Sequence, residues 1–197
     1  MHRYKIVIQY DGSFFKGWQL QKNQKTVQGE IENALMTIAK SKSRIIVKGS
    51  GRTDAGVHAI GQVAHFDLDN HLTEKQLLNA LNFYTDENCK IMSLCKTHDR
   101  FDSRFDAKNR TYKYQIYFGK SILYRNQAWL KNDNIDIKIL NQLANYIVGE
   151  HDFLSFSKYN PEMKNTRSYI YYSKWEIEKK MLTYKVCANR FMHHMIR

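Results

Sequence analysis

The sequence of 197 residues has one proline, three cysteines and no long run of apolar residues. The single proline and the lack of low-complexity segments argue against a disordered chain. No stretch approaches the ~18 apolar residues of a membrane span, and the N-terminus lacks the apolar core of a signal peptide. Cys89, Cys95 and Cys187 form no C-x-x-C pair, which disfavours a disulfide framework or a zinc ribbon. We therefore expect a folded, soluble, cytoplasmic protein with no membrane partner.

Acidic residues are also in short supply. Lysine and arginine number 31 against 19 aspartates and glutamates, which gives a formal net charge of +12. Residues 158–197 contain nine basic and three acidic residues, so this segment carries half of the excess. Basic residues mixed with aromatic ones are typical of nucleic-acid surfaces, where cations meet phosphates and rings stack on bases. The charge favours a nucleic-acid partner, although a generally basic soluble protein would have the same composition.

The first half of the chain alternates between strand and helix periodicity. Residues 26–40 place apolar side chains on one helical face, with Thr26 as the N-cap, and Thr73 and Gln76 have capping-box spacing. The predicted elements are a strand at 3–10, a helix at 26–40, strands at 44–48 and 62–68, a helix at 73–82 and a strand at 90–96. This β-α-β-β-α-β order is the split βαβ, or ferredoxin-like, pattern.

The second half begins the same pattern again and stops early. Its predicted elements are a strand at 110–118, a helix at 136–149, strands at 166–178 and 181–189, and the start of a helix at 190–197. The prediction is an α+β protein of two ferredoxin-like halves, residues 1–107 and 108–197, the second incomplete. We expect the halves to form one continuous antiparallel sheet, with helices on one face and a basic cleft on the other.

The segment GSGRTDAGVH, residues 49–58, concentrates glycine around one acid and one arginine, Asp54 and Arg52. A phosphate-binding loop would need a lysine after its last glycine, and the glycine spacing does not fit a dinucleotide fingerprint. Asp54 and His58 have no third metal ligand in view. A turn of purely structural importance remains an alternative, because aspartate and glycine are both good turn formers.

One interpretation uses every part of this loop. A carboxylate can act as nucleophile or as acid and base at a glycosidic carbon, and glycines let a flipped-out nucleotide approach the backbone closely. Hydrolytic glycosidases usually need two carboxylates, whereas this loop offers only Asp54. An isomerisation at the glycosidic bond would need one carboxylate and no cofactor.

Six motifs run along the whole chain: YDGSFFKGWQLQ (10–21), TVQGEIENAL (26–35), GRTDAGVHAIGQVAHF (51–66), RFDAKNRTYKY (104–114), GEHDFLSF (149–156) and NRFMHHMIR (189–197). In this order they resemble the tRNA pseudouridine synthase A family. The resemblance implies a homodimer of two ferredoxin-like halves that isomerises uridines 38, 39 and 40 in the anticodon arm of tRNA. It also implies that neither a metal nor an organic cofactor takes part.

The resemblance assigns roles to individual residues. Asp54 matches the catalytic aspartate, which attacks the sugar or removes a sugar proton. Arg52 matches an arginine that fills the vacated base stack or holds a phosphate. Tyr112 matches the tyrosine that stacks on the target uracil, and Tyr114 is the better candidate for a core tyrosine. Arg197 matches the arginine that pairs with the catalytic carboxylate.

Arg104 and Arg110 fit the lining of the expected cleft. The family continues beyond its last motif, whereas this chain stops at Arg197, so a truncated form of low stability and activity is expected. Two alternatives stay open at this point. A non-catalytic RNA-binding protein of the same fold would explain the charge but not the loop at 49–58. A metal-dependent nuclease would need several clustered carboxylates.

Overall fold

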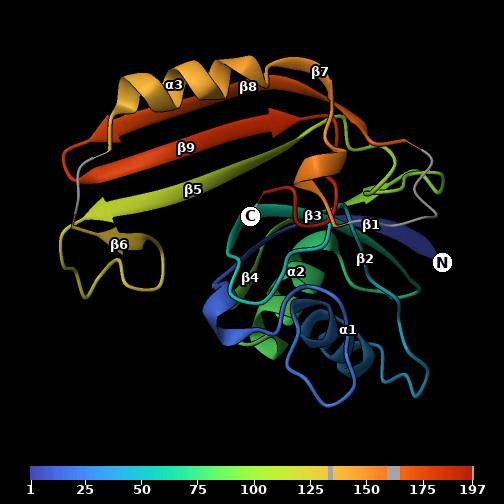
Figure 1. Ribbon diagram of the computed structural model, residues 1–197. Helices are drawn as coiled ribbons and strands as arrows, with labels where there is room; N and C mark the ends of the chain where they lie inside the picture. Colours follow the sequence, from blue (N-terminus) through green and yellow to red (C-terminus); the bar gives the residue numbers. More distant parts are fainter. Residues whose placement is uncertain (133–134, 159–164, 197) are drawn as a thin grey trace. The chain divides into compact units, whose positions relative to one another are not determined.

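The computed structural model describes residues 1–132, 135–158 and 165–196 (Figure 1). The chain divides into two compact units, Met1–Ala107 and Lys108–Arg197. Both units contain strands and helices, so the predicted α+β class is confirmed. No helix of the described residues is long and apolar enough to cross a membrane.

The first unit has the predicted element order around a four-stranded antiparallel sheet. Its sheet order is β2-β3-β1-β4, with β1 paired to both β3 and β4. The elements are β1 (His2–Tyr10), a 3₁₀ turn η1 (Gly12–Phe14), α1 (Val27–Ile38), β2 (Lys48–Gly49), β3 (Ala59–Leu68), α2 (Glu74–Tyr84) and β4 (Cys89–Thr97).

Both helices of the first unit begin where the sequence predicts. The Thr26 side chain accepts a hydrogen bond from the Gly29 backbone, and Thr73 and Gln76 form a complete capping box. Figure 1 shows α1 and α2 on one face of the sheet. Every second residue of β1 is buried against them, which places the core of the unit between sheet and helices.

The second unit contains a five-stranded sheet in the order β6-β5-β9-β8-β7. All its pairs are antiparallel except β5 with β6. The Asn141 side chain bonds both backbone groups of Trp175, which fastens α3 along β8. The elements are β5 (Arg110–Phe118), β6 (Trp129–Lys131), α3 (Ile137–Tyr146), β7 (Gly149–Asp152), a 3₁₀ turn η2 (Leu154–Phe156), β8 (Arg167–Glu178) and β9 (Met181–Ala188).

The expected single continuous sheet is not confirmed, because the strands of the described residues form two sheets. The unpredicted strand β6 pairs with the last three residues of β5, Ile116–Phe118, on the edge opposite β9. The short strand β7 was also missed. Each is only a few residues long, too short for a periodic pattern to be read from the sequence.

The strand predicted at 44–48 is wrong for most of its length, because only Lys48 and Gly49 pair with β3. The buried carboxylate of Glu32 takes the place of a neighbouring strand. Glu32 Oε1 accepts a hydrogen bond from the Val47 backbone N–H at 2.9 Å, and Glu32 Oε2 accepts one from Arg44 Nε at 2.6 Å. The Val47 carbonyl accepts from the Gln28 side chain at 3.1 Å, so both backbone groups of Val47 are satisfied by side chains of α1 rather than by the sheet.

The helix predicted from residue 190 is also wrong across the described residues 190–196, of which 190–192 are irregular and 193–196 form a turn. His194 has a φ of +68°, a left-handed conformation that an α-helix cannot contain. Met192 is buried, and Phe191 and Met195 pack against the same core. These apolar side chains are therefore accommodated without a helix. Arg197 itself lies outside the described residues.

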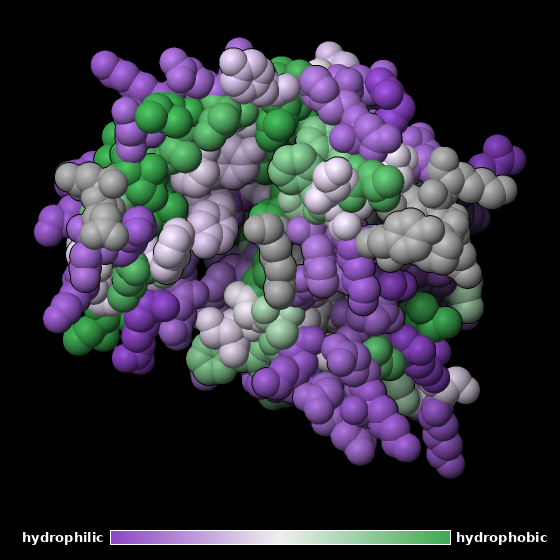
Figure 2. All heavy atoms as spheres, viewed as in Figure 1, coloured by the Kyte–Doolittle hydropathy of each residue, from purple (hydrophilic) through white to green (hydrophobic). Residues whose placement is uncertain are grey.

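The second unit has a smaller buried core than the first and exposes more large apolar side chains. Figure 2 shows such hydrophobic patches among hydrophilic side chains. On α3, Ile139, Leu143 and Tyr146 are exposed while Ala144 is buried, so this helix carries apolar residues on both faces. The first unit is thus the better-packed support for a site.

Candidate active site

The glycine loop at 49–58 is anchored to the end of β1 and the segment that follows it. The Tyr10 hydroxyl lies 2.8 Å from Thr53 Oγ1. The Trp18 backbone N–H donates to the Thr53 carbonyl at 3.0 Å. Tyr10 and Trp18 are both buried in the core of the first unit. Two core residues therefore fix Thr53, the residue directly before Asp54.

Two glycines bring the segment after β1 into contact with this loop. A Cβ on Gly12 would lie 2.1 Å from the Val57 carbonyl oxygen, and one on Gly17 would lie 2.8 Å from the Thr53 carbonyl oxygen. Gly17 also has a φ of +94°, which favours glycine over any other residue. Sequence reasoning missed both roles, although the two glycines lie in the quoted motif YDGSFFKGWQLQ.

Asp54 lies half-buried in a turn, in which its carbonyl accepts the Val57 N–H at 3.2 Å.

The glycines of the loop at 49–58 differ in how much space surrounds them. A Cβ on Gly51 or Gly56 would meet nothing within 4 Å, so there is open space beside these two. A Cβ on Gly49 would come within 2.6 Å of the Trp18 ring, so Gly49 serves core packing.

The two other titratable residues of the loop, Arg52 and His58, differ in exposure and in partners. Arg52 is exposed and forms no ion pair with another described residue. His58 is half-buried, with Nδ1 3.0 Å from Asp11 Oδ1. The loop therefore presents one exposed cation two residues before its half-buried carboxylate.

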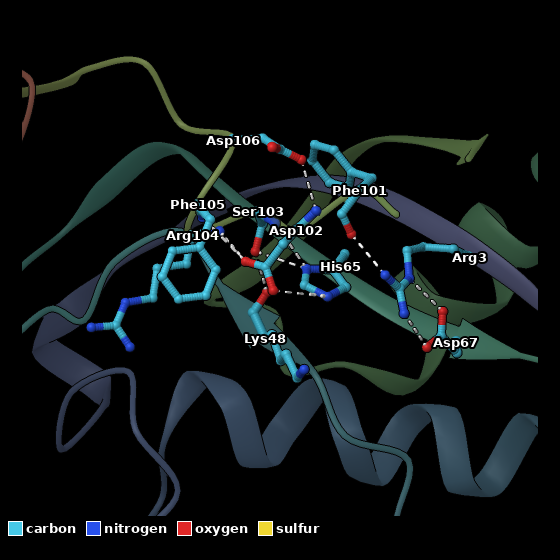
Figure 3. Close-up of polar contacts among 10 residues, drawn as sticks. All are labelled: Arg3, Lys48, His65, Asp67, Phe101, Asp102, Ser103, Arg104, Phe105 and Asp106. Atoms are coloured by element: carbon cyan, nitrogen blue, oxygen red, sulfur yellow. Dashed lines mark hydrogen bonds and ion pairs between the residues drawn. The ribbon is translucent and has the colours of Figure 1, made fainter. Parts of the chain in front are cut away.

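A second loop, residues 101–106, is bonded to the strands from which the glycine loop departs (Figure 3). Ser103 Oγ donates to the Lys48 carbonyl at 2.7 Å, and its backbone N–H donates to His65 Nδ1 at 3.0 Å. Lys48 and His65 are themselves paired across β2 and β3. Arg104, one of the predicted substrate-binding residues, follows Ser103 directly and is exposed.

The remaining predicted residues belong to the second unit. Arg110 Nη1 donates to the Asn189 carbonyl at 2.9 Å. Tyr112 is half-buried, and its ring meets Phe191 edge-on at 5.1 Å between centroids. Tyr114 is 45% exposed, so the expectation that it is the core tyrosine of this strand is wrong. The alternation of side chains along β5 does not by itself show which face of the sheet is buried, or at which residues.

Comparison with known proteins identifies the family. A family model described as tRNA pseudouridine synthase matches residues 6–106 and 143–197. The chain is 36% identical over 200 residues to tRNA pseudouridine synthase A 2 of Bacillus cereus, covering 100% of this chain and 81% of the relative. It is 40% identical over 200 residues to tRNA pseudouridine synthase A of Ehrlichia chaffeensis, covering 99% and 80%.

The chain belongs to the tRNA pseudouridine synthase family, as the six motifs predicted. It is an enzyme that isomerises uridine to pseudouridine in tRNA. Arg52, Asp54 and Arg104 lie in the matched ranges, whereas Arg110 and Tyr112 lie in the interval between them.

Proposed function

We propose that the enzyme acts on uridines 38, 39 and 40 in the anticodon arm and that Asp54 is its nucleophile. The observation that carries this proposal is the anchored loop at 49–58, whose one carboxylate, Asp54, lies in the chain between Gly51 and Gly56, two residues with open space beside them. A fixed backbone with space beside it suits a nucleotide that must leave its stack before reacting.

The reaction is balanced without a cofactor. The C1′–N1 bond breaks, the uracil turns, and C1′ joins C5. The proton on C5 is lost and N1 gains one, so substrate and product are isomers. Asp54 either attacks C1′ and is displaced by C5, or removes a sugar proton and returns it later. Both routes need an ionised carboxylate held in one place.

The other residues bind the RNA around this carboxylate. Arg52, exposed on the same loop, fills the vacated stack or holds a phosphate, for which the planar guanidinium is suited. Tyr112 stacks on the target uracil. Arg104 and Arg110 contact the phosphate backbone, and Arg197 pairs with the catalytic carboxylate.

The proposal extends to architecture and setting. Both units are proposed to be ferredoxin-like halves, which the strand order β2-β3-β1-β4 supports for the first. The enzyme is proposed to work as a homodimer in the cytoplasm, where tRNA is modified. Size-exclusion chromatography with light scattering would measure the mass of the assembly directly.

Release of tritium from tRNA labelled with [5-³H]uridine tests the catalytic proposal, because only loss of the C5 proton frees the label. We expect Asp54→Asn to abolish release and to keep tRNA binding, since affinity comes from many phosphate contacts. Asp69→Asn is the matched control, because Asp69 is 80% exposed and lies outside the loop. Near-normal release by a folded Asp54→Asn variant would overturn the assignment.

The positions are tested separately with tRNAs in which uridine 38, 39 or 40 is replaced by cytidine. Tritium release should fall with each replaced uridine and vanish when none of the three remains. Unchanged release from the tRNA lacking all three would place the target outside the anticodon arm while leaving Asp54 as the nucleophile.

A further inference from the structure

The loop at 101–106 is fixed more firmly than an exposed connection requires. Asp102 Oδ1 accepts the backbone N–H groups of Arg104 at 2.8 Å and Phe105 at 3.2 Å. Asp102 N–H donates to Asp106 Oδ2 at 2.8 Å. Ser103 is only 2% exposed and bonds to two strands. The backbone that carries Arg104 and Phe105 is therefore held in one conformation.

This rigid backbone presents an aromatic ring to solvent. Phe105 is 79% exposed, and the Arg104 guanidinium lies 5.6 Å from the centroid of its ring. In Figure 3 the two side chains lie side by side, on the side of the loop away from the Arg3–Asp67 pair. A cation over an exposed ring offers a flat, positively charged surface, which is what an unpaired base and its phosphate contact.

His65 joins this loop to the sheet beneath it. Because Nδ1 accepts the Ser103 N–H, the ring proton sits on Nε2, which lies 4.0 Å from Asp102 Oδ2. Burial lowers the pKa of His65; Arg3 and Lys48 act in the same direction, and the nearby acids oppose them. The neutral ring therefore keeps Nδ1 as an acceptor at neutral pH.

We propose that Phe105 is an RNA-contacting residue that stacks on an unpaired base of the tRNA, and that Ser103, His65 and Asp102 are its positioning residues. The proposal rests on the role of Arg104 as an RNA contact in the proposed function. The bond from Ser103 to Lys48 ties the stacking ring to the strand that leads into the glycine loop. The loop that carries Phe105 and the loop that carries Asp54 are thereby both attached to β2 and β3.

The first test measures equilibrium binding of an unmodified tRNA to Phe105→Ala. Loss of one base stack should weaken binding about 5- to 150-fold. Phe105→Trp should bind like the wild type, because it keeps a ring. The matched control is Phe83→Ala on α2, since Phe83 is also 79% exposed and equally able to lose its ring without a cavity. Binding by Phe105→Ala within twofold of the wild type, or an equal loss in Phe83→Ala, would overturn the proposal.

The second test asks whether Ser103 acts through Phe105. Ser103→Ala removes the bond to Lys48 and should weaken binding about fivefold, the worth of one hydrogen bond. In a Phe105→Ala background the same change should have no further effect on binding, because the ring it positions is gone. His65→Asn, whose amide oxygen takes the place of Nδ1, should retain wild-type binding. Full additivity of the two alanine changes would show that Ser103 is merely structural.

These binding measurements are independent of which carboxylate reacts. If Asp54→Asn stays active but Phe105→Ala binds weakly, the catalytic assignment fails and the RNA contact stands. If Asp54→Asn is inactive and Phe105→Ala binds normally, the catalytic assignment stands and the RNA contact at Phe105 fails.

Discussion

Tyr10 and Thr53 share a hydrogen bond of 2.8 Å between the tyrosine hydroxyl and the threonine Oγ1. Tyr10 ends β1, one of the two central strands of the first sheet, and is 3% exposed, while Thr53 directly precedes Asp54. The core of the first unit thus reaches the residue next to the proposed nucleophile. Changes that displace the segment after β1 should therefore act on catalysis without touching the carboxylate.

Gly17→Ala should disturb this connection. The added Cβ would lie 2.8 Å from the Thr53 carbonyl oxygen, and the φ of +94° would be strained in alanine. We expect a loss of stability of about 1 kcal/mol or more and a fall in kcat of about 100-fold, the typical cost of misplacing a reacting group by an ångström. Thermal melting and tritium release measure the two effects.

Gly51→Ala provides the control for stability. It lies in the same loop, but its Cβ would meet nothing within 4 Å, so its melting temperature should match the wild type. If Gly17→Ala melts and turns over like the wild type, the segment after β1 does not set the position of Asp54.

Asp67 gives a prediction about pH. The hydrogen bond from the Arg3 side chain lowers the pKa of Asp67 below its usual 3.8. The Arg3–Asp67 pair therefore stabilises the folded protein at pH values above the pKa that Asp67 has in the unfolded chain. This contribution is lost as the pH falls through the lower pKa that Asp67 has in the folded protein. Asp67→Asn should reduce stability at pH 7 by about 1 kcal/mol or less, because the pair is partly exposed.

The difference between Asp67→Asn and the wild type should shrink as the pH is lowered below about 4. Denaturant unfolding at a series of pH values measures it. Asp69→Asn, at an aspartate that is 80% exposed, should show no comparable pH-dependent difference. A difference that stays constant from pH 7 to pH 2 would show that the Asp67 charge is not what stabilises the pair.

Features that depend on residues close in the chain could be predicted from the sequence, whereas features that depend on side chains from distant parts of the chain could not. The capping box of Thr73 and Gln76 could be read from spacing alone and is present. The loss of strand pairing at 44–47 could not be predicted, because it depends on the Glu32 carboxylate of α1 bonding to the Val47 backbone. The same holds for the site: Asp54 stood out by composition, whereas Gly12 and Gly17 gain their meaning only from contact with residues about 40 positions away.

The basic surface predicts a steep dependence of binding on salt. The net charge of +12 and the basic segment at 158–197 motivate it. With roughly six phosphate contacts, affinity for tRNA should fall about a thousandfold between ~50 and ~200 mM salt, because each contact releases condensed counterions. Filter binding over this range measures the slope. A flat dependence would mean that the RNA is not held through its phosphates.

Tyr112 distinguishes stacking from hydroxyl chemistry. Tyr112→Phe keeps the ring and its edge-on contact with Phe191, so only a role of the hydroxyl is lost. Tyr112→Ala also loses the stack on the uracil, which should cost a further ~1–3 kcal/mol in kcat/KM. The alanine variant also opens a gap beside Phe191, so rates are compared only after melting shows a folded protein.

Tyr114→Ala is the matched control for this comparison. Tyr114 lies two residues along β5 and is 45% exposed, so its removal leaves no cavity and should not alter turnover. The expected order of kcat/KM is therefore Tyr114→Ala equal to the wild type, then Tyr112→Phe, then Tyr112→Ala. Equal, mild effects of both Tyr112 variants would leave this residue only the packing role that its contact with Phe191 already describes, and the stacking partner of the uracil would have to be sought elsewhere.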